Sequence, residues 1–128
     1  MSKKLQLLRS LLVASASPLL TRLPPERLAR TLEPRRVASP KRDGVPATVE
    51  RALSLTSRFI SHTCYTRGIT RYFLLSRSGY RVSLVFGIDP ESEPADGHCW
   101  IVMNAEPYLE SIDPNVRFTS VWSIGRAE

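Results

Sequence analysis

The sequence predicts an α+β fold in which helices come first and a small antiparallel sheet follows. Apolar residues recur at helical spacing through residue 78, with interruptions at proline, whereas the chain after Tyr80 has short segments rich in Val, Leu and Phe separated by turn residues. A hydrophobic fraction of 42% in 128 residues is enough for one real core. We therefore expect helices packed on an antiparallel meander.

The first segment is a basic, leucine-rich helix over residues 3–17, which we expect to end before Pro18 because proline cannot continue a helix. Leu5, Leu8, Leu12 and Leu19 recur near helical spacing. Such a helix can pack on its own domain, on a partner or on a membrane surface, and we favour packing on its own domain.

A second short helix is predicted from Pro24-Pro25-Glu26 to Leu32, since proline and an acidic residue suit the first turn of a helix. Residues 33–45 contain Pro34, Pro40 and Gly44 and read as a linker or surface loop. The expected division is a helical arm and linker over residues 1–45, followed by the main domain over 46–128.

The main domain is expected to contain two helices and then strands joined by turns. Asn104-Ala105 is the turn candidate, and Gly79 is a plausible helix stop. The two predicted helices cover residues 46–61 and the segment from Cys64 to just before Gly79. The predicted strands cover residues 80–88, 98–103 and 108–112, with a polar loop over 89–97 between the first two. Residues 118–124 form a last strand or a capping segment.

Charge is unevenly spread: residues 1–81 have a balance of +12 and residues 82–128 one of −6. A basic half can attract nucleic acid, an acidic membrane or an acidic peptide, but scattered arginines more often form a solvated face. No interleaving of aromatic and basic residues is present, so we expect no nucleic-acid binding. Two cysteines favour a reducing compartment such as the cytoplasm, and no apolar run approaches the roughly 20 residues that span a bilayer.

Cys64 is the candidate nucleophile because it stands at a predicted helix start, where the helix dipole and free backbone N–H groups stabilise a thiolate. His98, at the start of a strand, is the candidate base, whereas His62 is too close in sequence to swing over the sulfur. Adjacent His98 and Cys99 point to opposite faces of a strand, so we expect neither a zinc site nor any other metal or cofactor. Cys99 is expected to be a buried small residue.

The third catalytic position depends on the turn at Asn104. A two-residue turn places Glu110 on the face opposite to His98, and only a three-residue turn or a bulge places both on one face. Asp113 is the fallback. Trp100 shares the face of His98 and can wall the site, although a strand tryptophan is usually core.

The segment from Cys64 through Gly87-Ile88 to Gly97-His98-Cys99-Trp100 resembles the core of transglutaminase-like and papain-like proteins, and more narrowly the leader peptidase of lasso-peptide biosynthesis. In that family a cysteine opens a helix, a strand ends in Gly-Ile or Gly-Val, and His-Ala-Trp follows. The resemblance implies a carboxylate twelve residues after the histidine, here Glu110 in place of the commoner aspartate. Cys99 replaces the usual alanine.

The resemblance also implies a reaction and partners. The chain would remove the leader from a ribosomally made precursor peptide, delivered by a small leader-recognition protein, and a macrocyclase and an exporter would complete the pathway. Arg67 and Arg71, one helical turn apart, could hold the leader. The alternative is a non-catalytic adaptor of the same fold that binds a peptide or partner, with peripheral membrane contact also open.

Overall fold

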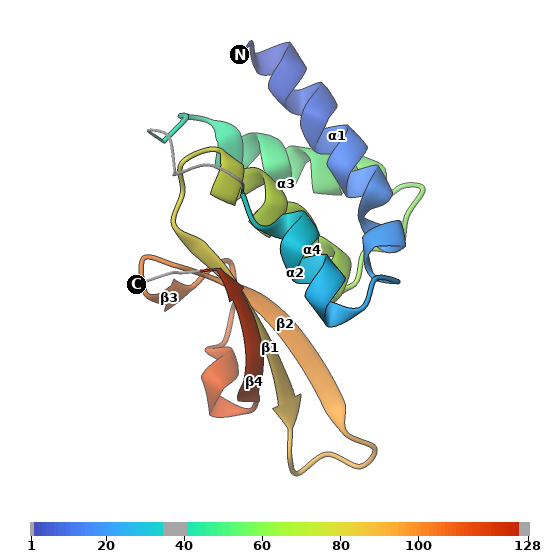
Figure 1. The fold of residues 1–128 in the computed structure, drawn as a ribbon, viewed down its shortest axis with the longest axis vertical. Helices are drawn as coiled ribbons and strands as arrows, with labels where there is room; N and C mark the ends of the chain where they lie inside the picture. The colour runs from blue at the N-terminus through green and yellow to red at the C-terminus, as the bar shows by residue number, and fades with distance from the viewer. Residues whose placement is uncertain (1, 35–40, 126–128) are drawn as a thin grey trace.

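The structure is a computed structural model that describes residues 2–34 and 41–125. Within these ranges the helices form one layer and a four-stranded sheet the other, which are the upper and lower halves of Figure 1. The α+β fold is therefore confirmed. The elements are α1 Lys3–Leu20, α2 Pro25–Leu32, α3 Val45–Thr56, α4 Cys64–Arg77, β1 Val82–Asp89, β2 Asp96–Met103, β3 Glu106–Pro107, the 3-10 helix η1 Pro114–Val116 and β4 Thr119–Gly125.

The sheet is antiparallel but is not a simple meander. Its strand order is β3-β2-β1-β4, so the last strand returns to pair with β1 instead of continuing beyond β3. The register between β1 and β4 shifts between Phe86 and Gly87, which marks a bulge. As a result, residues 108–118 connect one edge of the sheet to the other.

Helix α1 continues past Pro18, so the predicted end before this proline is wrong. Proline lacks the N–H that would bond the carbonyl four residues earlier, which is that of Ala14. The hydroxyl of Ser17 donates to this carbonyl at 2.7 Å. Because the carbonyl has a partner, the helix can run to Leu20.

Helix α1 packs on α3 and α4, as expected, but through a different face from the one its leucines suggested. Ser10, Ala14 and Ser17 are its buried residues, and the leucine stripe points outward. Small side chains allow the close approach of two helix backbones, which selects this face for packing. No helix in the described ranges is both long and apolar enough to cross a membrane.

Helix α3 ends at Thr56, five residues before the predicted end at 61. The hydroxyl of Thr56 donates to Ala52 O at 2.8 Å and lies 2.8 Å from His62 Nε2, which closes the helix end onto the following loop. Phe59, which the predicted helix over 46–61 included, is 88% exposed in that loop.

The turn at Asn104-Ala105 is confirmed, whereas the strand predicted over 108–112 is wrong. Both turn residues have positive φ, 54° and 63°, and Met103 pairs with Glu106, which defines a two-residue hairpin turn. The strand that follows is only Glu106–Pro107. Leu109 has φ 56°, a left-handed conformation that strands do not contain, so the chain turns away there.

One core joins the arm to the rest of the chain. Leu28 and Leu32 of α2 are fully buried in the same apolar cluster as Leu84 of β1. Arg77 of α4 fixes the end of α2 by donating to the carbonyls of Leu32 and its neighbours. The linker predicted over 33–45 lies partly outside the described residues, and the division at residue 45 stays a prediction.

Candidate active site

Cys64 is the first residue of α4, as predicted, and the preceding residue caps the helix. Thr63 Oγ1 accepts from the N–H of Thr66 at 3.2 Å, while the N–H of Thr63 donates to Thr66 Oγ1 at 2.9 Å. In the described part of the chain, the N–H groups of Cys64 and Tyr65 have no acceptor. Cys64 therefore stands at the positive end of the helix dipole, with two free backbone donors in the same turn.

Gly68, one turn beyond Cys64, brings α4 close to the sheet. A Cβ at this position would lie 2.7 Å from Leu84 Cδ1 and 2.8 Å from Cys99 Sγ, distances that real Cβ atoms do not show. Cys99 Sγ donates to the carbonyl oxygen of Cys64 at 3.6 Å. The first turn of α4 therefore rests directly on the strand residue that follows His98.

Cys99 is buried, in keeping with the small core residue that the sequence suggested. Burial, with a smaller contribution from the nearby Cys64, raises the pKa of its thiol far above the ordinary value. It therefore stays protonated and cannot act as a second nucleophile.

His98 is oriented by Glu110 and by two aromatic rings. Its Nε2 lies 2.5 Å from Glu110 Oε1, with 25% and 18% of the two side chains exposed. The imidazole stacks on Trp100, with ring centroids 5.7 Å apart, and lies against Phe118 at 5.1 Å. A carboxylate at Nε2 fixes the proton on that nitrogen, so Nδ1, which has no partner among the described residues, is the basic nitrogen.

Neither Gly87 nor Phe118 was predicted as a site residue, although Gly87 carried a usable signal and belongs to the Gly87-Ile88 motif of the resemblance. Glycine inside a β-rich strand often marks a close approach. A Cβ at Gly87 would lie 2.9 Å from the Trp100 ring and 3.0 Å from Phe118 Cβ. Gly87 pairs with His98 across the sheet, so its missing side chain leaves room for the rings that hold the imidazole.

Glu110 contacts His98, but not through the strand alternation from which the sequence prediction was made. The turn has two residues, which by strand alternation would place Glu110 on the wrong face. Because the strand ends at Pro107 and Leu109 is left-handed, alternation no longer applies and the chain carries Glu110 back to the histidine. Asp113, the fallback, instead accepts from the N–H of Asn115 at the start of η1.

Among the described residues, the candidate site lacks one interaction, a hydrogen bond between the thiol of Cys64 and the imidazole of His98. Cys99 lies under α4, and adjacent side chains on a strand point to opposite faces, so His98 projects from the other face of β2. No hydrogen bond joins Cys64 Sγ to the His98 ring anywhere in residues 2–34 and 41–125. Apo sites are often looser than the reacting complex.

The sequence model of the transglutaminase-like superfamily matches residues 10–123, nearly the whole chain. The chain belongs to the transglutaminase-like superfamily. This superfamily includes cysteine peptidases, and the match is consistent with the α+β fold described above. No curated protein and no solved structure matches the sequence.

Two of the three substrate contacts expected of this transglutaminase-like domain are occupied by other partners. Trp100 is 2% exposed behind His98, and Arg71 donates to both carboxylate oxygens of Glu50 at 2.9 and 2.7 Å. Burial and ion pairing argue against substrate contact by either side chain. Arg67 is exposed, and its role in substrate binding stays a prediction.

A run of three aromatic rings in this transglutaminase-like domain, which starts at the residue after Cys64, was not predicted from the sequence. Tyr65 meets Phe86 edge-on with ring centroids 5.6 Å apart, and Phe86 stacks on Trp122 at 4.9 Å. Trp122 is 36% exposed. The three rings come from α4, β1 and β4, so only the tertiary structure brings them together.

His62 joins two helices of the domain. Its Nε2 contacts the hydroxyl of Thr56 at 2.8 Å and its Nδ1 that of Thr66 at 3.0 Å. Burial, and to a lesser extent the charge of Arg67, lowers the pKa of His62 below its ordinary value. With both nitrogens engaged, His62 has no free base to offer. Within the described ranges, no group of three His, Cys, Asp or Glu side chains could hold a metal ion.

Proposed function

We propose that this protein is a cysteine endopeptidase that removes the leader from a ribosomally made lasso-peptide precursor. The observation that carries the proposal is the pair of His98 and Glu110, whose geometry leaves Nδ1 of His98 as a base. Cys64 at the start of α4 supplies the nucleophile. Membership of a superfamily that includes cysteine peptidases supports the reaction class.

In the proposed reaction, Nδ1 of His98 takes the proton of the Cys64 thiol, and the sulfur attacks the carbonyl carbon of the last leader residue. The N–H groups of Cys64 and Tyr65 stabilise the oxyanion. The C–N bond then breaks, and the imidazolium returns its proton to the leaving amine. Water, deprotonated by the same imidazole, hydrolyses the thioester and restores the thiol. Glu110 holds the ring and stabilises its charged form.

This mechanism requires Cys64 and His98 to approach each other when substrate binds. The aromatic run of Tyr65, Phe86 and Trp122, which begins at the residue after Cys64, would offer apolar surface for side chains of the precursor. We further propose that the enzyme works in the cytoplasm, where a small leader-recognition protein delivers the precursor and a macrocyclase closes the released peptide.

The test is cleavage of the cognate precursor with the leader-recognition protein present, followed by mass spectrometry. Cys64→Ala should abolish product, and Cys99→Ala, which gives the residue common in the resembled family, should cleave at near wild-type rate. An active Cys64→Ala variant would overturn the proposal, as would loss of activity confined to Cys99→Ala.

The second candidate is a non-catalytic adaptor of the same fold. The observation that favours it is the absence of a thiol–imidazole hydrogen bond within the described residues. An adaptor predicts that Cys64→Ala supports precursor maturation as well as wild type when a separate peptidase is present. If the protein is the peptidase, alkylation of Cys64 should stop cleavage, and the precursor should protect Cys64 from alkylation.

A further inference from the structure

The most buried residues of helix α1 are small, and four of its leucines are exposed on the opposite side. Ser10, Ala14 and Ser17 are at most 2% exposed, whereas four leucines on the opposite side are 53–66% exposed. A helix that covers its own core normally does the reverse. The outward residues, called here the leucine seam, are Leu5, Leu8, Leu12 and Leu19.

The spacing of the leucine seam is typical of a helix that pairs with another helix. Leu5, Leu12 and Leu19 are seven residues apart, and Leu8 follows Leu5 by three, which are the a and d positions of heptads. The exposed residue Ser15 takes the second d position. An a/d-only stripe is narrower than the broad apolar face of a helix that lies in a lipid interface.

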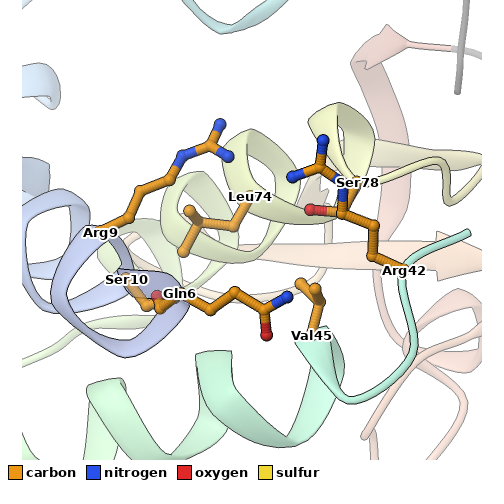
Figure 2. Close-up of a pocket in the computed structure, with 7 residues that line it drawn as sticks. All are labelled: Gln6, Arg9, Ser10, Arg42, Val45, Leu74 and Ser78. Carbon is orange, nitrogen blue, oxygen red and sulfur yellow. Dashed lines mark hydrogen bonds between the residues drawn. The ribbon is translucent and has the colours of Figure 1, made fainter. Parts of the chain in front are cut away.

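A pocket where α1 meets α3 and α4, lined by none of the seam leucines, contains two arginines without a carboxylate. Arg9 and Arg42 line it with Gln6, and Figure 2 shows the two guanidinium groups pointing toward each other across Leu74. No ion pair engages either arginine within residues 2–34 and 41–125. Two cations facing one opening favour an acidic side chain there.

The flanking charges also argue against a second copy of this chain as occupant. In the heptad frame, Lys4 falls at g and Arg9 at the following e. A parallel dimer of α1 would place Lys4 of one copy against Arg9 of the other, which is repulsive. Glutamates at the same positions of a different helix would be attracted to both.

We propose that α1 is a docking surface for an amphipathic helix of a partner protein, with leucine-like residues at a and d and glutamates on its flanks. The leucine seam packs against the partner's seam, and one glutamate pairs with Arg9 on its flank, where the guanidinium of Arg42 faces that of Arg9. The amino-terminal turns of α1 extend beyond the other helices (Figure 1), and all four seam leucines are more than half exposed. The inference does not depend on the chemistry at Cys64.

The experiment titrates the full-length protein into two fluorescein-labelled three-heptad peptides, both with leucine at a and d, one with glutamate and one with lysine at e and g. We expect the glutamate peptide to bind about tenfold or more tightly than the lysine peptide, with affinity that falls as salt rises. Equal binding of the two, or no binding of the glutamate peptide, would overturn the proposal.

Variants separate the seam from the pocket. Leu8→Glu with Leu12→Glu should abolish peptide binding, and Ser15→Glu, at an already exposed seam position, gives the same result without a risk to folding. Arg9→Glu with Arg42→Glu should weaken binding of the glutamate peptide by about tenfold and should strengthen binding of the lysine peptide. Val116→Glu, an 80% exposed apolar position on η1, is the matched control and should bind as wild type.

The same variants also test two other occupants of the leucine seam, an anionic membrane and a second copy of this protein. Co-sedimentation with phosphatidylglycerol vesicles that Ser15→Glu removes, without peptide binding, would assign the seam to an anionic membrane and overturn the helix proposal. A concentration-dependent dimer in sedimentation velocity, lost in Leu12→Glu, would assign it to a second copy and overturn it equally.

Discussion

The two histidines of this protein, His62 in the loop before α4 and His98 in β2, have opposite surroundings. His62 has a threonine hydroxyl at each ring nitrogen, whereas His98 has a carboxylate at Nε2 and no partner at Nδ1 within the described residues. The first arrangement uses the whole ring as a bridge between α3 and α4. The second orients the ring and leaves one nitrogen for chemistry. The difference teaches that the partners of a histidine, more than its distance in sequence from a cysteine, decide what it can do.

The largest expected effect comes from removing the imidazole that has a free nitrogen. His98→Ala should lower kcat/KM for precursor cleavage by about 10³-fold or more, because both proton transfers pass through this ring. His62→Gln should stay within about tenfold of wild type, since its amide can still bond a hydroxyl. Steady-state cleavage of the precursor by both variants measures the difference, and equal losses would erase the distinction between the two histidines.

The next effect concerns the carboxylate that distinguishes the two sites. Glu110→Gln should lower kcat by about 10- to 10²-fold with little change in KM, because the amide holds the ring without stabilising its charge. Glu110→Asp should recover part of the loss. The matched control is Asp113→Asn, whose side chain serves η1 and should keep wild-type cleavage. If Asp113→Asn were the damaging change, the orienting role would move to that residue.

On the structural side of the comparison, His62→Ala should destabilise the fold by about 1–3 kcal/mol, because the hydroxyls of Thr56 and Thr66 lose a partner at once. Urea unfolding followed by circular dichroism measures the change. His98→Ala is the control, since its ring is 25% exposed and serves the site more than the core, and it should cost less. A larger loss for His98→Ala would reverse the assignment.

The smallest effect is on the pH dependence of stability. Because the pKa of His62 is lowered in the folded protein, the unfolded chain binds more protons below its ordinary value near 6.5. The free energy of unfolding is therefore fully retained above that pH and falls as the pH drops from there to the lowered value. His62→Gln should flatten this slope.

Unfolding at several pH values above about 5 checks this prediction, because the ordinary pKa of a free carboxyl group is near 4. Asp89 illustrates the separation: a hydrogen bond from Arg117 holds its pKa below its ordinary value, so its contribution is lost only in stronger acid. An unchanged slope in His62→Gln would mean that other groups set the pH dependence.

The sequence by itself determined the α+β class, the helix start at Cys64 and the turn at Asn104-Ala105. The helix start and the turn are local decisions: the threonine before the helix accepts from the N–H of Thr66, and asparagine tolerates the left-handed conformation of a tight turn. Buried Cys99 also followed from strand alternation, a rule that needs no knowledge of distant residues.

Only the tertiary structure decided how Glu110 meets His98 and which face of α1 is buried. The first depends on where a strand stops pairing, at Pro107, and on the left-handed Leu109, neither of which alternation can foresee. The second depends on the close packing of α1 on α3 and α4, which favours Ala14 and its small neighbours over leucines. Both are settled by contacts between segments far apart in the chain, where packing overrides the local pattern.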